Sequence, residues 1–112
     1  MGLTFDEYQR FTHETAVYPY VGSGHTTALA YLGLGLAGEA GEVANKIKKL
    51  IRDGDDPEMR HQIRTELGDV IWYLARLSDE LGTSLKAVAA SNRLKLQSRK
   101  DRGVIGGSGD HR

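Results

Sequence analysis

The sequence contains no cysteine and no long apolar run. Without cysteine the chain cannot hold a disulfide framework, a thiolate zinc site or a cysteine nucleophile, and this composition suits a reducing compartment. A membrane-spanning helix needs about 18 consecutive apolar residues, and an export signal needs an apolar stretch near the N-terminus. The stretch from Met1 to Arg10 carries charges instead. We therefore expect a cytoplasmic protein with no membrane partner.

An excess of charge of one sign is also absent. The 15 basic and 15 acidic residues cancel, so no overall field draws the chain to nucleic acid or to an anionic membrane. We expect no nucleic-acid partner. The length of 112 residues is typical of a single domain with one modest core.

What the sequence does contain is helical periodicity. Thr4 and Glu7 form a T-x-x-E capping box, which predicts a first helix that runs to about Tyr18 and ends before Pro19. Three further segments repeat apolar residues at helical spacing. The four predicted helices cover about residues 5–18, 26–52, 57–81 and 83–99.

Cap residues separate the later helices. Gly54 and Gly82 end the second and third helices. Asp56 and Pro57 suit the cap and the first position of the third helix, and Thr83 can cap the fourth. No strand-like alternation and no repeat of solenoid length occurs, so the fold class is all-α.

The apolar stripes of the second and third helices should face each other. We expect an antiparallel hairpin of these two helices, with the first and fourth packed around them as in a four-helix bundle. The stripes are long for so small a core, which favours a homodimer or homotetramer over a monomer. The domain spans residues 1–101, and the Gly-rich segment 102–112 is predicted to be a flexible tail. The stripe positions are Leu29, Leu32, Leu36, Val43, Ile47 and Leu50, then Ile63, Leu67, Val70, Leu74, Leu77 and Leu81.

Two pairs of acids flank these stripes. At about 100° per residue, Glu39 and Glu42 lie beside the stripe of the second helix, on the same side as Lys46. Glu66 and Asp69 lie in the same way beside the stripe of the third helix. When the stripes face each other, the four carboxylates can converge, and they then repel unless cations neutralise them. Because every ligand is a carboxylate oxygen, Mg²⁺ or Mn²⁺ is favoured over zinc.

These acids also carry a family resemblance. The segments EAGE at 39–42 and ELGD at 66–69 resemble the E-x-x-E and E-x-x-D signature of the MazG-like all-α nucleotide pyrophosphohydrolases. The surrounding sequence is also similar to that family, over roughly residues 28 to 100. The similar segments are GLGLAGEAGEV at 33–43, ELGDVIWYL at 66–74 and SNRLKLQSR at 91–99. The resemblance implies that the four acids bind Mg²⁺ and that water attacks the α-phosphorus of a (deoxy)nucleoside triphosphate. The products would be a nucleoside monophosphate and pyrophosphate.

The sequence does not decide which residue accepts the proton from water. Glu42 is a candidate because it lies further from the apolar stripe, and Glu39 is the other acid that we place at the catalytic centre. Another nearby carboxylate could serve as well.

The substrate contacts are expected on two helices. Asn92, Lys95 and Arg99 share a polar face of the fourth helix, and the resemblance implies that they hold the β- and γ-phosphates. The alternative is an ordinary basic helix end. Tyr73 and Trp72 follow the second acid pair and could stack on a nucleobase, or else pack in the core or an interface. Lys46 completes this set of substrate-binding candidates.

Gly33, Gly35 and Gly38 match G-x-G-x-x-G, but no strand precedes them, so a dinucleotide site is excluded. These glycines, with Gly41 and Gly68, instead favour close approach of a neighbouring helix or of the metal cluster. Two other functions remain as alternatives: a phosphoribosyl-ATP pyrophosphohydrolase, and a non-catalytic helical interaction or regulatory module.

Overall fold

A computed structural model describes residues 2–112, and within this range every regular element is a helix. The all-α class is thereby confirmed. None of the helices described is both long enough and apolar enough to cross a membrane. The elements are α1 (Phe5–Thr12), the 3₁₀ turn η1 (His13–Thr15), α2 (Thr26–Asp53), α3 (Pro57–Glu80) and α4 (Leu85–Asp101).

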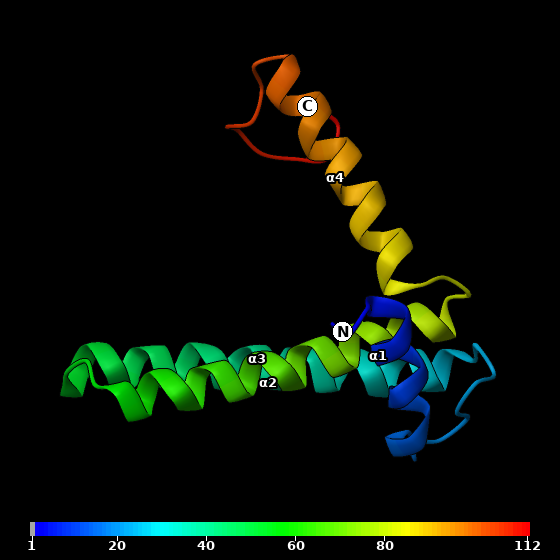
Figure 1. The fold of residues 1–112 in the computed structure, drawn as a ribbon, viewed down its shortest axis with the longest axis horizontal. Helices are drawn as coiled ribbons and strands as arrows, with labels where there is room; N and C mark the ends of the chain where they lie inside the picture. The colour runs from blue at the N-terminus through cyan, green and yellow to red at the C-terminus, as the bar shows by residue number, and fades with distance from the viewer. Residues whose placement is uncertain (1) are drawn as a thin grey trace.

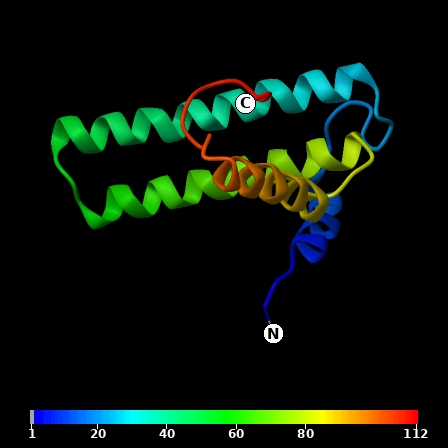
Figure 2. The ribbon, with the colours of Figure 1, turned by 90° about the horizontal axis from the view of Figure 1, so that it is seen from above.

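The long helices α2 and α3 form the predicted antiparallel hairpin (Figures 1 and 2). Their ends match the cap residues of the sequence. Asp56 Oδ1 accepts from the Met59 N–H at 2.8 Å, and Pro57 follows as the first helical residue. Helix α1 packs against α3 at the end of the hairpin opposite the α2–α3 turn (Figure 1).

Helix α1 is shorter than predicted. It gives way to a 3₁₀ turn after Thr12 and does not continue to Tyr18. The Thr12 hydroxyl donates to the Gln9 carbonyl oxygen at 2.6 Å, a local bond that competes with helix continuation. The chain then runs extended at Ala16, and this brings Tyr18 into the core, where it is buried.

Helix α4 leaves the hairpin, although we expected it to pack along it. The buried Gln9 fixes its start, since the Gln9 side-chain amide donates to the Thr83 carbonyl oxygen at 3.1 Å and accepts from the Leu85 N–H at 2.8 Å. The cap is Ser84, not the expected Thr83, because Ser84 Oγ accepts from the Ala87 N–H. Beyond this first turn the helix projects away from α2 and α3 (Figure 1).

The buried core is small and lies at the α1 end of the hairpin. Tyr18, Ala28 and Leu32 are its buried centre, and Trp72 and Leu77 pack against it. Several predicted stripe positions lie at the surface, because a hairpin of two helices covers only one side of each. These exposed positions are Ile47 (42%), Leu67 (52%), Leu74 (40%) and Leu81 (64%).

A buried ion pair within α3 anchors the segment before α2. Arg76 is fully buried, with its Nη2 3.7 Å from Glu80 Oε2 and 3.2 Å from Asp79 Oδ2. The Tyr18 hydroxyl accepts from Arg76 Nη2 at 2.9 Å and donates to Glu80 Oε2 at 2.5 Å. The side chains of Arg76 and Glu80 are thus fully hydrogen-bonded, as buried charges must be.

The Glu80 carboxylate also holds the loop that leads into α2. Its oxygens accept from the backbone N–H of Gly22 at 2.7 Å and of Gly24 at 2.9 Å. Gly24 has φ +68°, and a Cβ there would lie 3.2 Å from the Glu80 carbonyl oxygen, so this close approach requires glycine. Burial alone would raise the pKa of Glu80. The hydrogen bonds from Tyr18 and the two glycines, with the charge of Arg76, outweigh burial and hold that pKa below its usual value.

We expect Glu80→Gln to lower the free energy of unfolding by about 3 kcal/mol, since it leaves a buried guanidinium with only Asp79 as an anionic partner. Denaturant unfolding followed by circular dichroism measures this. Glu58→Gln, on an exposed turn of the same helix, is the control and should change stability by less than about 0.5 kcal/mol.

The stability of wild type and of Glu80→Gln should also depend differently on pH. Because the pKa of Glu80 is lower in the folded state than its usual 4.5, its stabilising contribution is complete above that value. It is lost as the pH falls through the lower folded pKa. The stability difference between wild type and Glu80→Gln should therefore shrink on acidification below 4.5. A difference that stays constant down to acid unfolding would contradict this assignment.

Candidate active site

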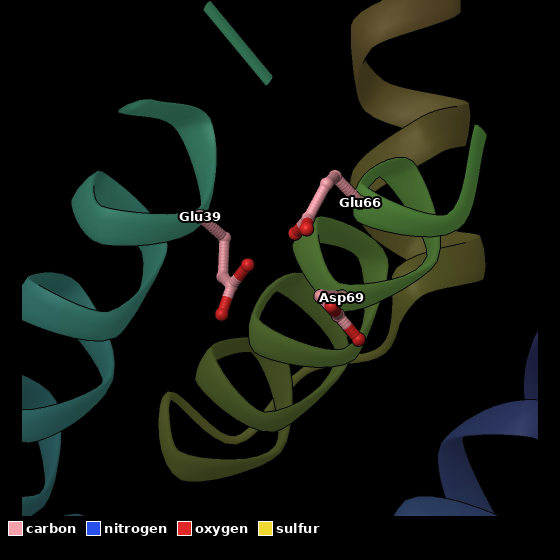
Figure 3. Close-up of side chains that lie close together, drawn as sticks. All are labelled: Glu39, Glu66 and Asp69. Atoms are coloured by element: carbon pink, nitrogen blue, oxygen red, sulfur yellow. The ribbon is translucent and has the colours of Figure 1, made fainter. Parts of the chain in front are cut away.

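Three carboxylates meet across the seam between α2 and α3. Glu39 extends from α2, and Glu66 and Asp69 extend from adjacent turns of α3 (Figure 3). Each offers an oxygen, and these oxygens lie within 4.8 Å of one another. The spacing of three residues puts both α3 acids on one face, and the antiparallel pairing turns that face toward Glu39.

The carboxylates of this cluster repel one another. A hydrogen bond shared with the Glu66 carboxyl raises the pKa of Glu39, and burial and the negative charges of Asp69, Glu66 and Glu42 add to the effect. Lys46 Nζ lies 3.8 Å from a Glu66 oxygen and compensates part of the charge. One ammonium group does not balance three carboxylates. A divalent cation fits the cluster, and an all-oxygen donor set matches Mg²⁺ or Mn²⁺.

Glu42 stands apart from the cluster. It lies one turn further along α2, and it is exposed, whereas Glu39 and Glu66 are half-buried. The three-carboxylate group does not include it. Its charge nevertheless contributes to the raised pKa of Glu39, so it borders the site.

A hollow opens beside Glu39 and Asp69. Its volume is ≈ 370 Å³, and its lining residues are Phe11, Thr15, Glu39, Asp69, Trp72 and Tyr73. The Trp72 indole N–H donates to Thr15 Oγ1 at 2.7 Å, which fixes the indole plane. The Tyr73 ring meets that indole edge-on, with centroids 5.0 Å apart. Both aromatic side chains therefore pack on the core and line the hollow at once.

Sequence reasoning did not assign Phe11 or Thr15 to the site. Phe11 lies in the predicted first helix, and no motif marks it. Thr15 reaches the hollow through the 3₁₀ turn that ends α1, and nothing in the sequence pattern predicts that turn.

Tyr73 lies directly over Gly35 of α2. A Cβ at residue 35 would stand 2.2 Å from the Tyr73 ring, so the predicted close approach of a neighbouring helix is confirmed here. The other glycines at issue, Gly33, Gly38, Gly41 and Gly68, have open space where a Cβ would be. Close packing within one chain does not explain them.

The structure does not bring the α4 candidates to the acid cluster. Asn92 and Lys95 border a separate hollow of ≈ 430 Å³ along α4. Lys95 and Arg99 each lie 3.3 Å from Asp110 of the C-terminal segment. Their helix projects away from the hairpin (Figure 1).

The comparison with known proteins identifies the family of the chain. The family model of the MazG nucleotide pyrophosphohydrolase domain matches residues 25–104. The chain belongs to this MazG family. The Gene 37 protein of Mycobacterium phage L5 is 50% identical to this MazG chain over 111 residues, which cover 96% of the chain and 97% of the phage protein. No solved structure matches the chain.

The matched range contains all three clustered carboxylates and Glu42. It also contains Trp72 and Tyr73, but it begins after Phe11 and Thr15. The MazG domain thus supplies the acids, and the segment that precedes it supplies part of the wall of the hollow.

The contact of Gly35 with Tyr73 gives a test of this packing. We expect Gly35→Ala to lower the free energy of unfolding by about 1–2 kcal/mol, because the Tyr73 ring must shift against the indole that packs on it. Gly33→Ala is the matched control. It meets no neighbour, so it should raise stability by up to about 1 kcal/mol through helix propensity. Equal effects of the two substitutions, measured by thermal and denaturant unfolding, would refute the close packing at Gly35.

Proposed function

We propose that this MazG protein hydrolyses (deoxy)nucleoside triphosphates between the α- and β-phosphates, with Mg²⁺ or Mn²⁺ as cofactor. The observation that carries the proposal is the convergence of Glu39, Glu66 and Asp69 beside an aromatic hollow. In the reaction the oxygen of water bonds to the α-phosphorus and the bond to the bridging oxygen breaks. The products are a nucleoside monophosphate and pyrophosphate.

The three clustered carboxylates would hold the divalent cation. When bound, that cation neutralises phosphate oxygens and increases the acidity of water. Glu42 is our candidate for the general base, because it borders the cluster without belonging to it and is open to solvent. A carboxylate at that position can take the proton of the attacking water and release it to solvent.

The aromatic hollow would hold the base of the nucleotide. Trp72 and Phe11 offer flat apolar surfaces within the same hollow as Glu39 and Asp69. Burial, with the charges of nearby residues including Glu39 and Asp69, raises the pKa of Tyr73. Its hydroxyl therefore keeps its proton at neutral pH and can donate a hydrogen bond.

The phosphate contacts need a second copy of the chain. Asn92, Lys95 and Arg99 are the candidates for the β- and γ-phosphates, but their helix projects away from the hairpin of its own chain (Figure 1). Exposed apolar side chains line both the hairpin, at Leu67 and Leu74, and α4, at Leu94. A homodimer or homotetramer would cover these side chains and could bring α4 of one copy to the acids of another.

The test is a product assay with a panel of ribo- and deoxynucleoside triphosphates, and phosphoribosyl-ATP, in the presence of Mg²⁺. We expect monophosphate and pyrophosphate in equal amounts. Asp69→Asn and Glu42→Gln should each lower kcat by at least ~100-fold with the helical circular dichroism signal unchanged. EDTA should abolish turnover, and Zn²⁺ should restore it poorly.

The control variant for this assay is Glu58→Gln, which removes a carboxylate from α3 outside the cluster. Its kcat should equal that of wild type. Stepwise release of orthophosphate, or near-normal turnover of Asp69→Asn, would rule out the proposed reaction at this site.

A further inference from the structure

Two cationic side chains of α4 converge on one oxygen of the chain itself. Lys95 Nζ and Arg99 Nη2 both donate to Asp110 Oδ1, each at 3.3 Å. The Arg99 side chain is only 5% exposed, so its guanidinium is held in place and largely stripped of water. An ammonium and a guanidinium aimed at a single anionic oxygen form the kind of arrangement that binds phosphate groups.

The segment after α4 is folded back so that Asp110 reaches this pair. The Arg112 guanidinium donates to the carbonyl oxygens of Val104, Ile105 and Gly109, and these bonds close the segment into a loop. Gly109, the residue before Asp110, has φ +85°, a conformation that side chains disfavour.

The contact at Asp110 is ionic but open to solvent. Hydrogen bonds from Arg99 and Lys95, together with their charges, lower the pKa of Asp110, so its carboxylate is ionised at neutral pH. The Asp110 side chain is 77% exposed. Lys95 is 42% exposed as well, and an ion pair between two exposed side chains contributes little free energy and can exchange with a competing anion. The buried guanidinium of Arg99 keeps an anionic partner when such an anion replaces Asp110.

Lys95 and Arg99 are the pair that the proposed function assigns to the β- and γ-phosphates, and we propose that Asp110 is a built-in competitor for the phosphate group at this pair. A diphosphate or triphosphate group carries more charge and more acceptor oxygens than one carboxylate, so it displaces Asp110 when it binds. The C-terminal segment then has to release, and the apparent affinity for the anion is lower than the pair alone would give. This inference rests on the phosphate role that the proposed function gives to Lys95 and Arg99, but binding of a phosphate group at the pair can be measured without any turnover.

Inorganic pyrophosphate is the probe, used in isothermal titration with EDTA present. The chelator keeps cations from the acid cluster, which then repels the probe, so binding reports the α4 pair. Removing one exposed competing charge should tighten binding two- to fivefold in Asp110→Asn. Asp101→Asn is the matched control. It removes the same charge from the same end of α4, but Asp101 accepts a hydrogen bond from Gln97 and does not contact the pair. It should bind pyrophosphate as wild type does.

Lys95→Ala should weaken binding and should abolish the gain when combined with Asp110→Asn. Equal affinities of Asp110→Asn and wild type, or equal gains in Asp110→Asn and Asp101→Asn, would overturn the proposal. So would wild-type binding by Lys95→Ala.

Kinetics separate this inference from the proposed function. If the chain hydrolyses nucleoside triphosphates, Asp110→Asn should lower KM by the same two- to fivefold while kcat stays within about twofold. If no nucleotide is hydrolysed, the pyrophosphate titration still decides whether Asp110 competes at the α4 pair. An unchanged KM beside a tightened pyrophosphate affinity would overturn the catalytic consequence alone.

Discussion

The buried pair of Arg76 and Glu80 is the interaction on which the rest of the structure depends. The apolar core is small, and this pair links α3 to the loop that precedes α2. By binding the backbone of Gly22 and Gly24, Glu80 determines where α2 starts relative to the end of α3. The register of the whole hairpin follows from this anchoring point.

That register brings the acids together. Along α2, Glu39 lies roughly 20 Å from the first residue of the helix, at about 1.5 Å per residue. Along α3, Glu66 lies roughly 20 Å back from Glu80. The helices are antiparallel, and the hydrogen bonds of Glu80 to Gly22 and Gly24 hold the start of α2 beside the end of α3. The equal distances from this point therefore place the two glutamates opposite each other (Figure 3). The repulsion between them is the cost of a site that can hold a divalent cation.

Local signals in the sequence predicted the hairpin, and long-range contacts account for what was missed. The cap at Asp56 and the acid motifs depend on residues a few positions apart, so the ends of α3 and the presence of Glu39 at the site could be predicted. Burial of Arg76 could not be predicted, because a charged helix residue is ordinarily exposed and two of its hydrogen-bond partners, Thr12 and Tyr18, lie far away in sequence. The direction of α4 likewise depends on one long-range contact, from Gln9. Periodicity alone also overestimated how much of the apolar stripes one chain can bury.

We propose above that the acids on α2 and α3 form one divalent-cation site. A titration of Mn²⁺ into the protein, with free Mn²⁺ followed by electron paramagnetic resonance, tests this claim without any substrate. We expect saturable binding that is weakened at least about tenfold by Asp69→Asn and by Glu39→Gln, which lie on different helices. Binding by both variants with the affinity of wild type would contradict it.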